Sequence, residues 1–166
     1  MRVYIPATLA MLSEFVAQGS LQPRSGTAFA VTPTLVEAYA EGDDEELAEV
    51  AIGEAALASM RLLSGEPAET PARRAVVVAE VPAEAVTVRP DLDDAVVRVT
   101  GRIAMDQVVA VFVDNPAAEP AVRAAVAVID VADLGDEDAE LTVGDAQDHD
   151  LAWYATQELP FLLDLL

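Results

Sequence analysis

The residues best suited to chemistry lie near the end of the chain, where the only histidine, His149, is followed by Asp150, Trp153 and Tyr154. Tryptophan and tyrosine often line binding surfaces, because each combines a large apolar area with one polar group. We therefore name these four residues as candidate binding residues. The interpretation that we favour for Trp153 is that it anchors the C-terminal segment on the core, and the alternative is that it belongs to a binding surface.

Acidic residues around this segment have the chemistry of metal ligands. Asp145, Asp148, His149 and Asp150 could hold a divalent cation through oxygen and imidazole groups. A second acidic series, at positions 136, 138 and 140, begins like a calcium loop but lacks the glycine and the final glutamate that such a loop needs. We favour a solvated acidic surface for both, and predict neither a metal site nor a cofactor.

No motif of nucleophilic catalysis is found. The chain has no cysteine, which excludes a thiol nucleophile, a thiolate zinc site and a disulfide. It has no G-x-S-x-G turn and no glycine-rich phosphate loop after a strand. A catalytic triad would have to use His149, and no serine lies in a nucleophile context. We therefore lean against an enzyme.

The charge balance narrows the class of partner. The chain of 166 residues carries 30 acidic and 9 basic residues, a net charge of −21, and all the basic residues are arginine. Such a charge repels nucleic-acid phosphates and anionic lipid, so we expect no direct nucleic-acid binding. It favours a cationic protein partner or simply solubility. No signal peptide is visible and no apolar stretch approaches a membrane span, so we expect no membrane association and a cytoplasmic location.

These residues must be positioned by strands and helices that alternate along the chain. Strands are predicted at residues 2–5, 27–31, 75–81, 95–100, 108–113 and 151–155. Helices are predicted at residues 9–18, 33–40, 43–63 and 119–134 and, after Thr156, at 159–166. Thr8 and Thr32 are expected N-caps, and Pro6 is expected to end the first strand. Residues 64–72 read as a surface linker, and residues 136–150 as an acidic loop.

We therefore predict one α+β domain, residues 1–166, with a mixed, mostly antiparallel sheet and helices packed on it. The segment 136–166 is the least defined part of this prediction. Its apolar end, 159–166, is expected to dock on its own domain, and the alternative is that it fills the groove of a partner.

The sequence resembles a known family at three places. The segments RVYIPATLAMLSEFVAQG (2–19), TAFAVTP (27–33) and DHDLAWYATQE (148–158) are similar to a family of short acidic actinobacterial proteins, a domain of unknown function. This resemblance covers nearly the whole chain. The family has no assigned activity, so it implies no substrate.

The order of the predicted elements is also similar to that of ADP-ribosyltransferase-like folds. That resemblance implies a His or Arg on the first strand, a Tyr or Ser on the second and a Glu near a later strand. Here the first position holds Ile5 or Pro6, the second Phe29 or Thr32, and the third Asp94 or apolar residues. The resemblance therefore implies a catalytically inactive relative or a binding module.

Three functions remain open from the sequence. The first is a non-catalytic protein-interaction module with an acidic surface. The second is a degenerate ADP-ribosyltransferase-like binder of a nucleotide or small ligand, which requires Tyr4, Thr8, Thr32 and Tyr39 to converge on one pocket. The third is a nucleic-acid mimic, which requires carboxylates in paired rows on one face.

Overall fold

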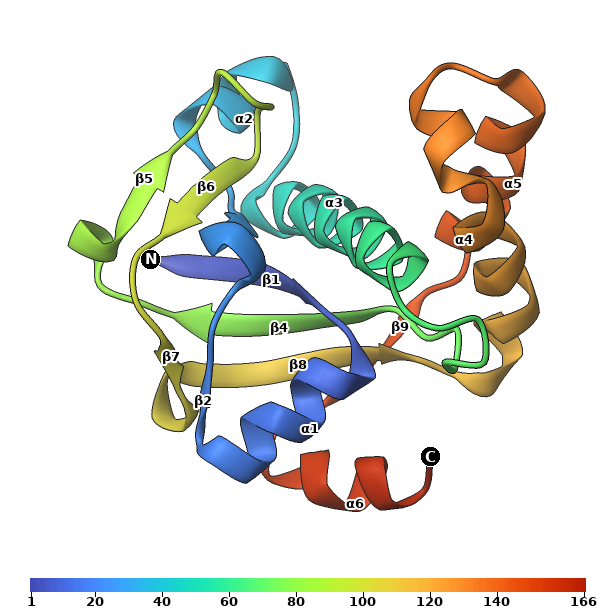
Figure 1. Ribbon diagram of the computed structural model, residues 1–166. Helices are drawn as coiled ribbons and strands as arrows, with labels where there is room; N and C mark the ends of the chain where they lie inside the picture. Colours follow the sequence, from blue (N-terminus) through green and yellow to red (C-terminus); the bar gives the residue numbers. More distant parts are fainter.

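A twisted antiparallel sheet forms the centre of the computed structural model, which describes all residues 1–166 (Figure 1). Seven strands pair in the order β5-β6-β3-β1-β4-β8-β9, and β2 and β7 form a separate two-stranded sheet. The strands are β1 (Arg2–Ala7), β2 (Ser20–Leu21), β3 (Thr27–Phe29), β4 (Ala75–Glu80), β5 (Val86–Val88), β6 (Val96–Val99), β7 (Ile103–Ala104), β8 (Val108–Asp114) and β9 (Leu151–Tyr154). Every strand pair is antiparallel, and the predicted α+β class is confirmed.

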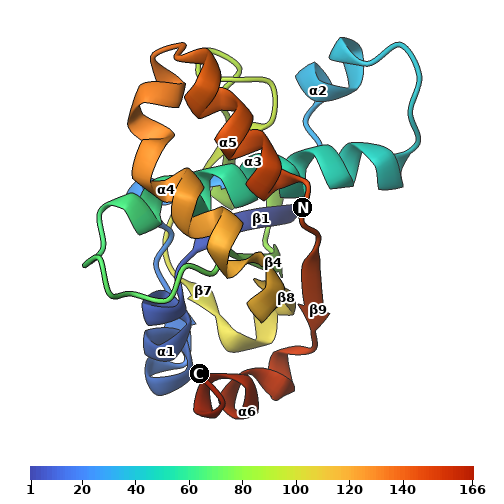
Figure 2. The ribbon, with the colours of Figure 1, turned by 90° about the vertical axis from the view of Figure 1, so that its right-hand side faces the viewer.

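Helices cover both faces of the large sheet. They are α1 (Leu9–Gln18), α2 (Pro33–Ala38), α3 (Asp44–Ser64), α4 (Glu119–Asp133), α5 (Glu137–Gln147) and α6 (Leu159–Asp164). Helices α1 and α6 lie on one face, and α3 crosses the other (Figures 1 and 2). The α4–α5 hairpin packs beside the C-terminal half of α3. Residues 65–74 form the loop between α3 and β4, as the predicted linker requires.

Local signals position several of these helices. The hydroxyl of Thr8 accepts a hydrogen bond from the backbone N–H of Met11, and the hydroxyl of Thr32 accepts one from Leu35. Both predicted N-caps are therefore confirmed. Gly19 ends α1 with φ of 75°, a left-handed conformation that glycine adopts without steric strain.

The alternation of side chains along the strands divides the core in two. Val3, Ile5 and Val77 belong to the cluster under α1 and α6, whereas Tyr4 and Val76 belong to the cluster under α3. The buried hydroxyl of Ser59 on α3 donates to the carbonyl of Ala7 and accepts from the N–H of Ala75, at 2.7 and 3.0 Å. One serine thus fixes α3 to the adjoining ends of β1 and β4.

Two predictions about the elements are wrong. Pro6 lies inside β1 and does not end it. Met1 and Val81 exchange both backbone hydrogen bonds, so every second residue from Met1 onward directs its backbone groups toward β4. Pro6 is one of the residues in between, and the N–H that it lacks would point toward β3, where only Tyr4 of β1 is paired. The expected acidic loop 136–150 contains helix α5, which begins after Asp136 because that carboxylate accepts from the N–H of Ala139 at 2.9 Å.

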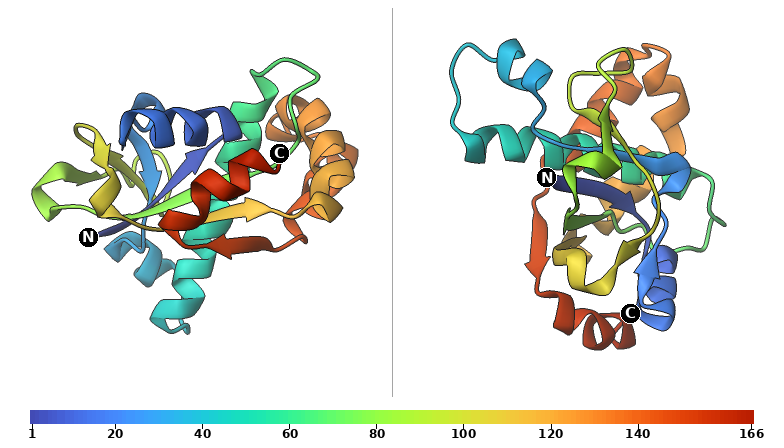
Figure 3. Two further views of the ribbon diagram at one scale, coloured as in Figure 1. Left: turned by 90° about the horizontal axis from the view of Figure 1, so that it is seen from below. Right: turned by 90° about the vertical axis from the view of Figure 1, so that its left-hand side faces the viewer.

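The C-terminal segment is only partly docked. Leu159 and Leu162 are buried in the cluster beneath the sheet, and α6 lies against α1 (Figure 3). Phe161 and Leu165 remain exposed at 73% and 86% of their surface. The expected self-docking therefore holds for one face of this short helix and is wrong for the other.

Candidate functional site

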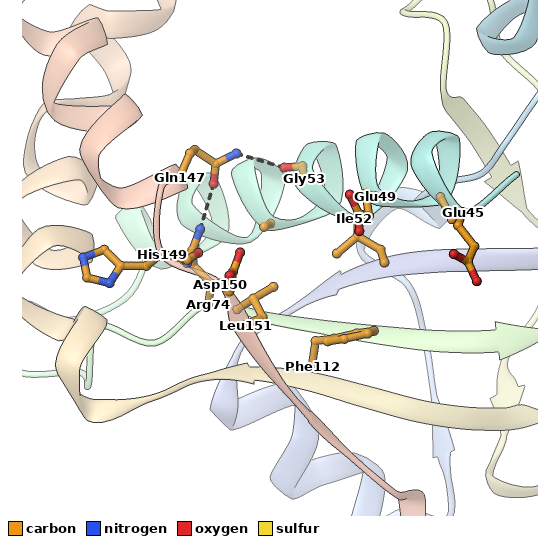
Figure 4. A pocket seen from close by; sticks show the side chains of 12 residues that line it. Glu45, Glu49, Ile52, Gly53, Arg74, Phe112, Gln147, His149, Asp150 and Leu151 are labelled. Atoms are coloured by element: carbon orange, nitrogen blue, oxygen red, sulfur yellow. Dashed lines mark hydrogen bonds between the residues drawn. The ribbon is translucent and has the colours of Figure 1, made fainter. Parts of the chain in front are cut away.

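A groove lies between α3 and the strands β8 and β9, at the end of α5. Its larger part is a hollow of about 750 Å³ on the α3 side of the sheet (Figure 4). A second hollow of about 370 Å³ continues it along the sheet and shares Ile52 and Phe112 with it. The lining residues of the two hollows are Glu45, Ala48, Glu49, Ile52, Gly53, Ala56, Arg74, Phe112, Gln147, His149, Asp150 and Leu151 in the first, and Arg2, Tyr4, Ile52, Val78, Val109, Ala110, Phe112 and Trp153 in the second.

The groove exists because α3 covers only part of its sheet face. The helix packs against β1, β4 and β3 and leaves the same face of β8 and β9 without a helix above it. Phe112 on β8 and Trp153 on β9 lie directly opposite each other in the strand register. Phe112 is half-buried and Trp153 is 59% exposed, so together they form an accessible aromatic floor.

A buried ion pair closes one end of the groove. The guanidinium of Arg74 donates from Nε and Nη2 to the two carboxylate oxygens of Asp114, at 2.9 and 2.8 Å. It also donates from Nη1 to the side-chain oxygen of Gln147 and from Nη2 to the carbonyl of His149, at 2.9 and 2.7 Å. Gln147 in turn donates to the carbonyl of Gly53 on α3. The network ties the start of β4, the end of β8, α3 and the end of α5 together.

Strand register explains why Arg74 and Asp114 meet. Ala75 of β4 lies opposite Val113 of β8. Because the two strands are antiparallel, Arg74, which precedes Ala75, lies opposite Asp114, which follows Val113. The side chains of Arg74 and Asp114 are 2% and 0% exposed. Because the positive charge is matched by a carboxylate at contact distance, it contributes little net charge to the groove.

The remaining charge of the groove is negative. Glu45 and Glu49 are exposed on α3, and Asp150 is exposed before β9; none of the three forms an ion pair or a hydrogen bond through its side chain. At the other end, Arg2 is paired with Glu80 at 2.7 Å. The groove therefore combines an apolar floor with unneutralised carboxylates.

Burial also shifts one titratable group in this groove. The pKa of Tyr4 is raised above its ordinary value, mainly because the ring is buried; the neighbouring Arg2 opposes this shift and Glu80 adds to it. Its hydroxyl therefore stays protonated across the physiological range and cannot act as an anionic base. The lining of both hollows contains no serine, threonine, cysteine or lysine, and the hydroxyl of Tyr4 is the only one in it.

The structure brings together four of the eight candidate binding residues. Tyr4 and Trp153 line the smaller hollow, and His149 and Asp150 line the larger one. His149 contributes its backbone carbonyl to Arg74, while its imidazole is directed away from Phe112 and Ile52 (Figure 4). The side chain of His149 is thus peripheral to the aromatic floor.

The other four candidates lie outside the groove. The hydroxyls of Thr8 and Thr32 are buried as helix caps, and Thr32 also donates to the carbonyl of Asp94. Tyr39 is exposed after α2, and Tyr154 packs on the opposite face of the sheet, in the cluster with α1 and α6. The expectation that Tyr4, Thr8, Thr32 and Tyr39 converge on one pocket is therefore wrong.

The favoured interpretation of Trp153 is also wrong. Its exposure excludes a role as the core anchor of the C-terminal segment, and that position is taken by Leu159 and Leu162. The alternation of side chains along β9 gives the reason. Tyr154 points toward the face of the sheet that α1 and α6 cover, so its neighbour Trp153 points toward the opposite face, where the groove lies.

Sequence reasoning missed most of the groove. Glu45 does not stand out in the sequence, because it lies among the acidic residues of the first turn of α3, where negative charge is common, and Arg74 has no distinctive sequence context apart from its position. A signal did exist, because Arg74 immediately precedes one predicted apolar strand and Asp114 immediately follows another. Only the pairing of β4 with β8 shows that these two strand ends are adjacent.

Among known proteins, the chain matches a family model, whereas no curated protein and no solved structure matches it. No group of three or more potential metal ligands is clustered in the structure, and none of its helices has the length and apolarity needed to cross a bilayer. Residues 1–163 match a family described as "Family of unknown function (DUF6912)", so the chain belongs to the DUF6912 family.

Proposed function

We propose that this protein is a cytoplasmic, non-catalytic interaction module that binds a cationic segment of a partner protein in the groove between α3 and β8–β9. The observation that carries the proposal is the combination of an exposed aromatic floor with three carboxylates that have no cation of their own. A lysine or arginine side chain matches both features, because its stem is apolar and its head is positive.

The geometry distinguishes the groove from the rest of the acidic surface. Glu45 and Glu49 are four residues apart on α3 and therefore lie on the same helical face. Asp150 lies on the opposite wall, at the start of β9 (Figure 4). A cation placed over Phe112 and Trp153 would be attracted from both walls, and the aromatic faces add a favourable cation–π interaction.

The net charge of the whole chain supports the same class of partner. At −21 it attracts cationic segments over distances of about one Debye length, roughly 10 Å at 0.1 M salt. It repels phosphate-bearing ligands, which is why the groove supports a cationic partner in preference to a nucleotide.

The test is the binding of a short fluorescent peptide of alternating arginine and valine, measured by anisotropy. We expect Glu45→Gln/Glu49→Gln to weaken binding roughly tenfold, from the loss of two charge interactions of about 0.5–1 kcal/mol each. We expect binding to weaken further when the salt concentration rises from about 50 mM to about 300 mM.

The matched control removes the same charge elsewhere. Glu14 on α1 and Glu84 before β5 are exposed, and their side chains form no hydrogen bond or ion pair. The variant Glu14→Gln/Glu84→Gln should bind within about twofold of the wild type, the small loss reflecting net charge alone. An equal loss in both double variants, or no binding of the peptide at low salt, would show that the groove is not a cation site.

A further inference from the structure

Strand β9 is an open edge of the large sheet. It pairs with β8 on one side and with nothing on the other. Figure 2 shows it along one margin of the molecule, with no helix or loop beyond it. The edge therefore presents free backbone groups to solvent.

The hydrogen-bond pattern shows which backbone groups are free. The N–H of Asp114 donates to the carbonyl of Arg74, on the β4 side of β8. The backbone N–H and C=O groups of successive residues point to opposite sides of a strand, so those of Val113 and Val111 point toward β9. They form hydrogen bonds with Ala152 and Tyr154, their partners in the register. The N–H and C=O groups of the remaining residues of β9, Leu151 and Trp153, point outward, and no hydrogen bond outside the sheet involves them.

This edge lacks the devices that usually block strand addition. Its four residues, Leu-Ala-Trp-Tyr, include no charge and no proline, and the β8–β9 register runs without a bulge. The opposite edge, β5, is shorter, and Pro82 and Pro90 lie on either side of it. Of the two edges, β9 is the one open to another strand.

Charge determines which strand it can accept. Asp148 and Asp150 precede β9, and Glu158 follows it. Antiparallel pairing of β9 with a second copy of itself would bring Asp148 and Asp150 of one chain near Glu158 of the other, and each chain carries a net charge of −21. A cationic strand instead meets opposite charge at both ends of the edge.

From these observations we propose that the partner's cationic segment binds as an added antiparallel β-strand on β9, with its arginine or lysine side chains lying over Trp153 into the groove. This inference rests on the proposed function and specifies the form of the ligand. In antiparallel pairing, the residues that bond Leu151 and Trp153 carry side chains on the same face as those two residues, which is the groove face. Backbone pairing and side-chain recognition are thus made by the same residues of the partner.

The experiment compares three forms of the arginine–valine peptide: unmodified, N-methylated at the arginines and N-methylated at the valines. All three have the same charge and side chains. In the proposed register the arginine amides face β9 and the valine amides face solvent. We expect arginine methylation to weaken binding by about tenfold or more, through lost hydrogen bonds, and valine methylation to leave it nearly unchanged.

A variant of the protein tests the same backbone hydrogen bonds, with the change made in β9 and not in the peptide. Leu151→Pro removes an outward N–H without removing a ladder bond, and it should weaken binding of the unmodified peptide more than Leu151→Val does. Sedimentation measures self-association in parallel, and a wild-type dimer that excludes the peptide would assign the edge to a second copy.

The outcomes separate this inference from the proposed function. If the peptide binds and depends on Glu45 and Glu49, but both methylated forms bind like the unmodified one, the groove binds cations and strand addition is wrong. If the unmodified peptide does not bind at low salt, both are wrong. Loss confined to the arginine-methylated form supports both.

Discussion

Replacing Asp114 by alanine should be among the most damaging single changes to the stability of this protein. The substitution leaves the guanidinium of Arg74 buried without a counter-charge, since the two side chains are 0% and 2% exposed. It removes both carboxylate contacts of the guanidinium and the hydrogen bond that the backbone N–H of Arg74 donates to the same carboxylate, at 2.8 Å. Breaking a buried pair in this way costs about 3–5 kcal/mol.

That magnitude is large relative to the stability of an ordinary domain, about 5–15 kcal/mol. For a chain of this length it corresponds to a fall in Tm of roughly 6–20 °C. Urea unfolding at pH 7, followed by circular dichroism, measures the change in free energy, and an unchanged slope with denaturant shows that the unfolding reaction is the same.

The chain provides a matched control with the same geometry at the surface. Arg61 on α3 donates from Nε and Nη2 to both oxygens of Asp133 on α4, each at 2.9 Å. These side chains are 44% and 41% exposed, so Asp133→Ala should cost no more than about 1 kcal/mol. The contrast between the two variants isolates burial as the cause.

A double variant tests the reason for the cost. Arg74→Met/Asp114→Leu removes both charges and fills the same space with apolar groups, so it should be more stable than Asp114→Ala. The reasoning is refuted if Asp114→Ala costs no more than Asp133→Ala, or if the double variant is as unstable as the single one.

Two further changes test other parts of α3, outside the lining of the groove. Glu54 on α3 has a raised pKa, first through burial and then through the nearby charge of Asp93. Its ionised form is therefore less favourable in the folded chain than in the unfolded chain, which lowers stability as pH rises above the ordinary glutamate range. Glu54→Gln should raise Tm at pH 7 and lose this advantage near pH 4, and an advantage equal at both pH values would contradict the assignment. Ser59→Ala should cost about 1–3 kcal/mol in urea unfolding, because it removes two hydrogen bonds from buried backbone groups, the carbonyl of Ala7 and the N–H of Ala75. Ser64→Ala, at an exposed hydroxyl, is its control and should be close to neutral; equal losses would show that the buried bonds of Ser59 contribute nothing.

Much of the local structure follows from short segments of sequence. Thr8 and Thr32 start helices because their hydroxyls accept from N–H groups three residues later, within the same turn. The apolar run of β4 predicts a central strand because both of its faces are buried. Asp136 carries the same kind of N-cap signal for α5, although the acidic composition of that segment favoured a loop.

The groove could not be predicted in this way, because its parts are far apart in the sequence. The contact between Arg74 and Asp114 depends on the pairing of β4 with β8, and the contact of Arg74 with Gln147 depends on where the α4–α5 hairpin packs. The exposure of Trp153 depends on α3 covering β1 and β4 and not β9. Aromatic residues near a chain end fit a core position and a surface position equally well until the covered face is known.

The sequence by itself determined the α+β class, the helix caps, most strands and the strong negative charge, since each is set by residue type or by neighbours within one or two turns. Only the tertiary structure decided which carboxylates lack a partner, which aromatic side chain is accessible and which strand edge is free. Those properties depend on strand order and on which face each helix covers, and both are set by the balance of long-range packing over the whole chain.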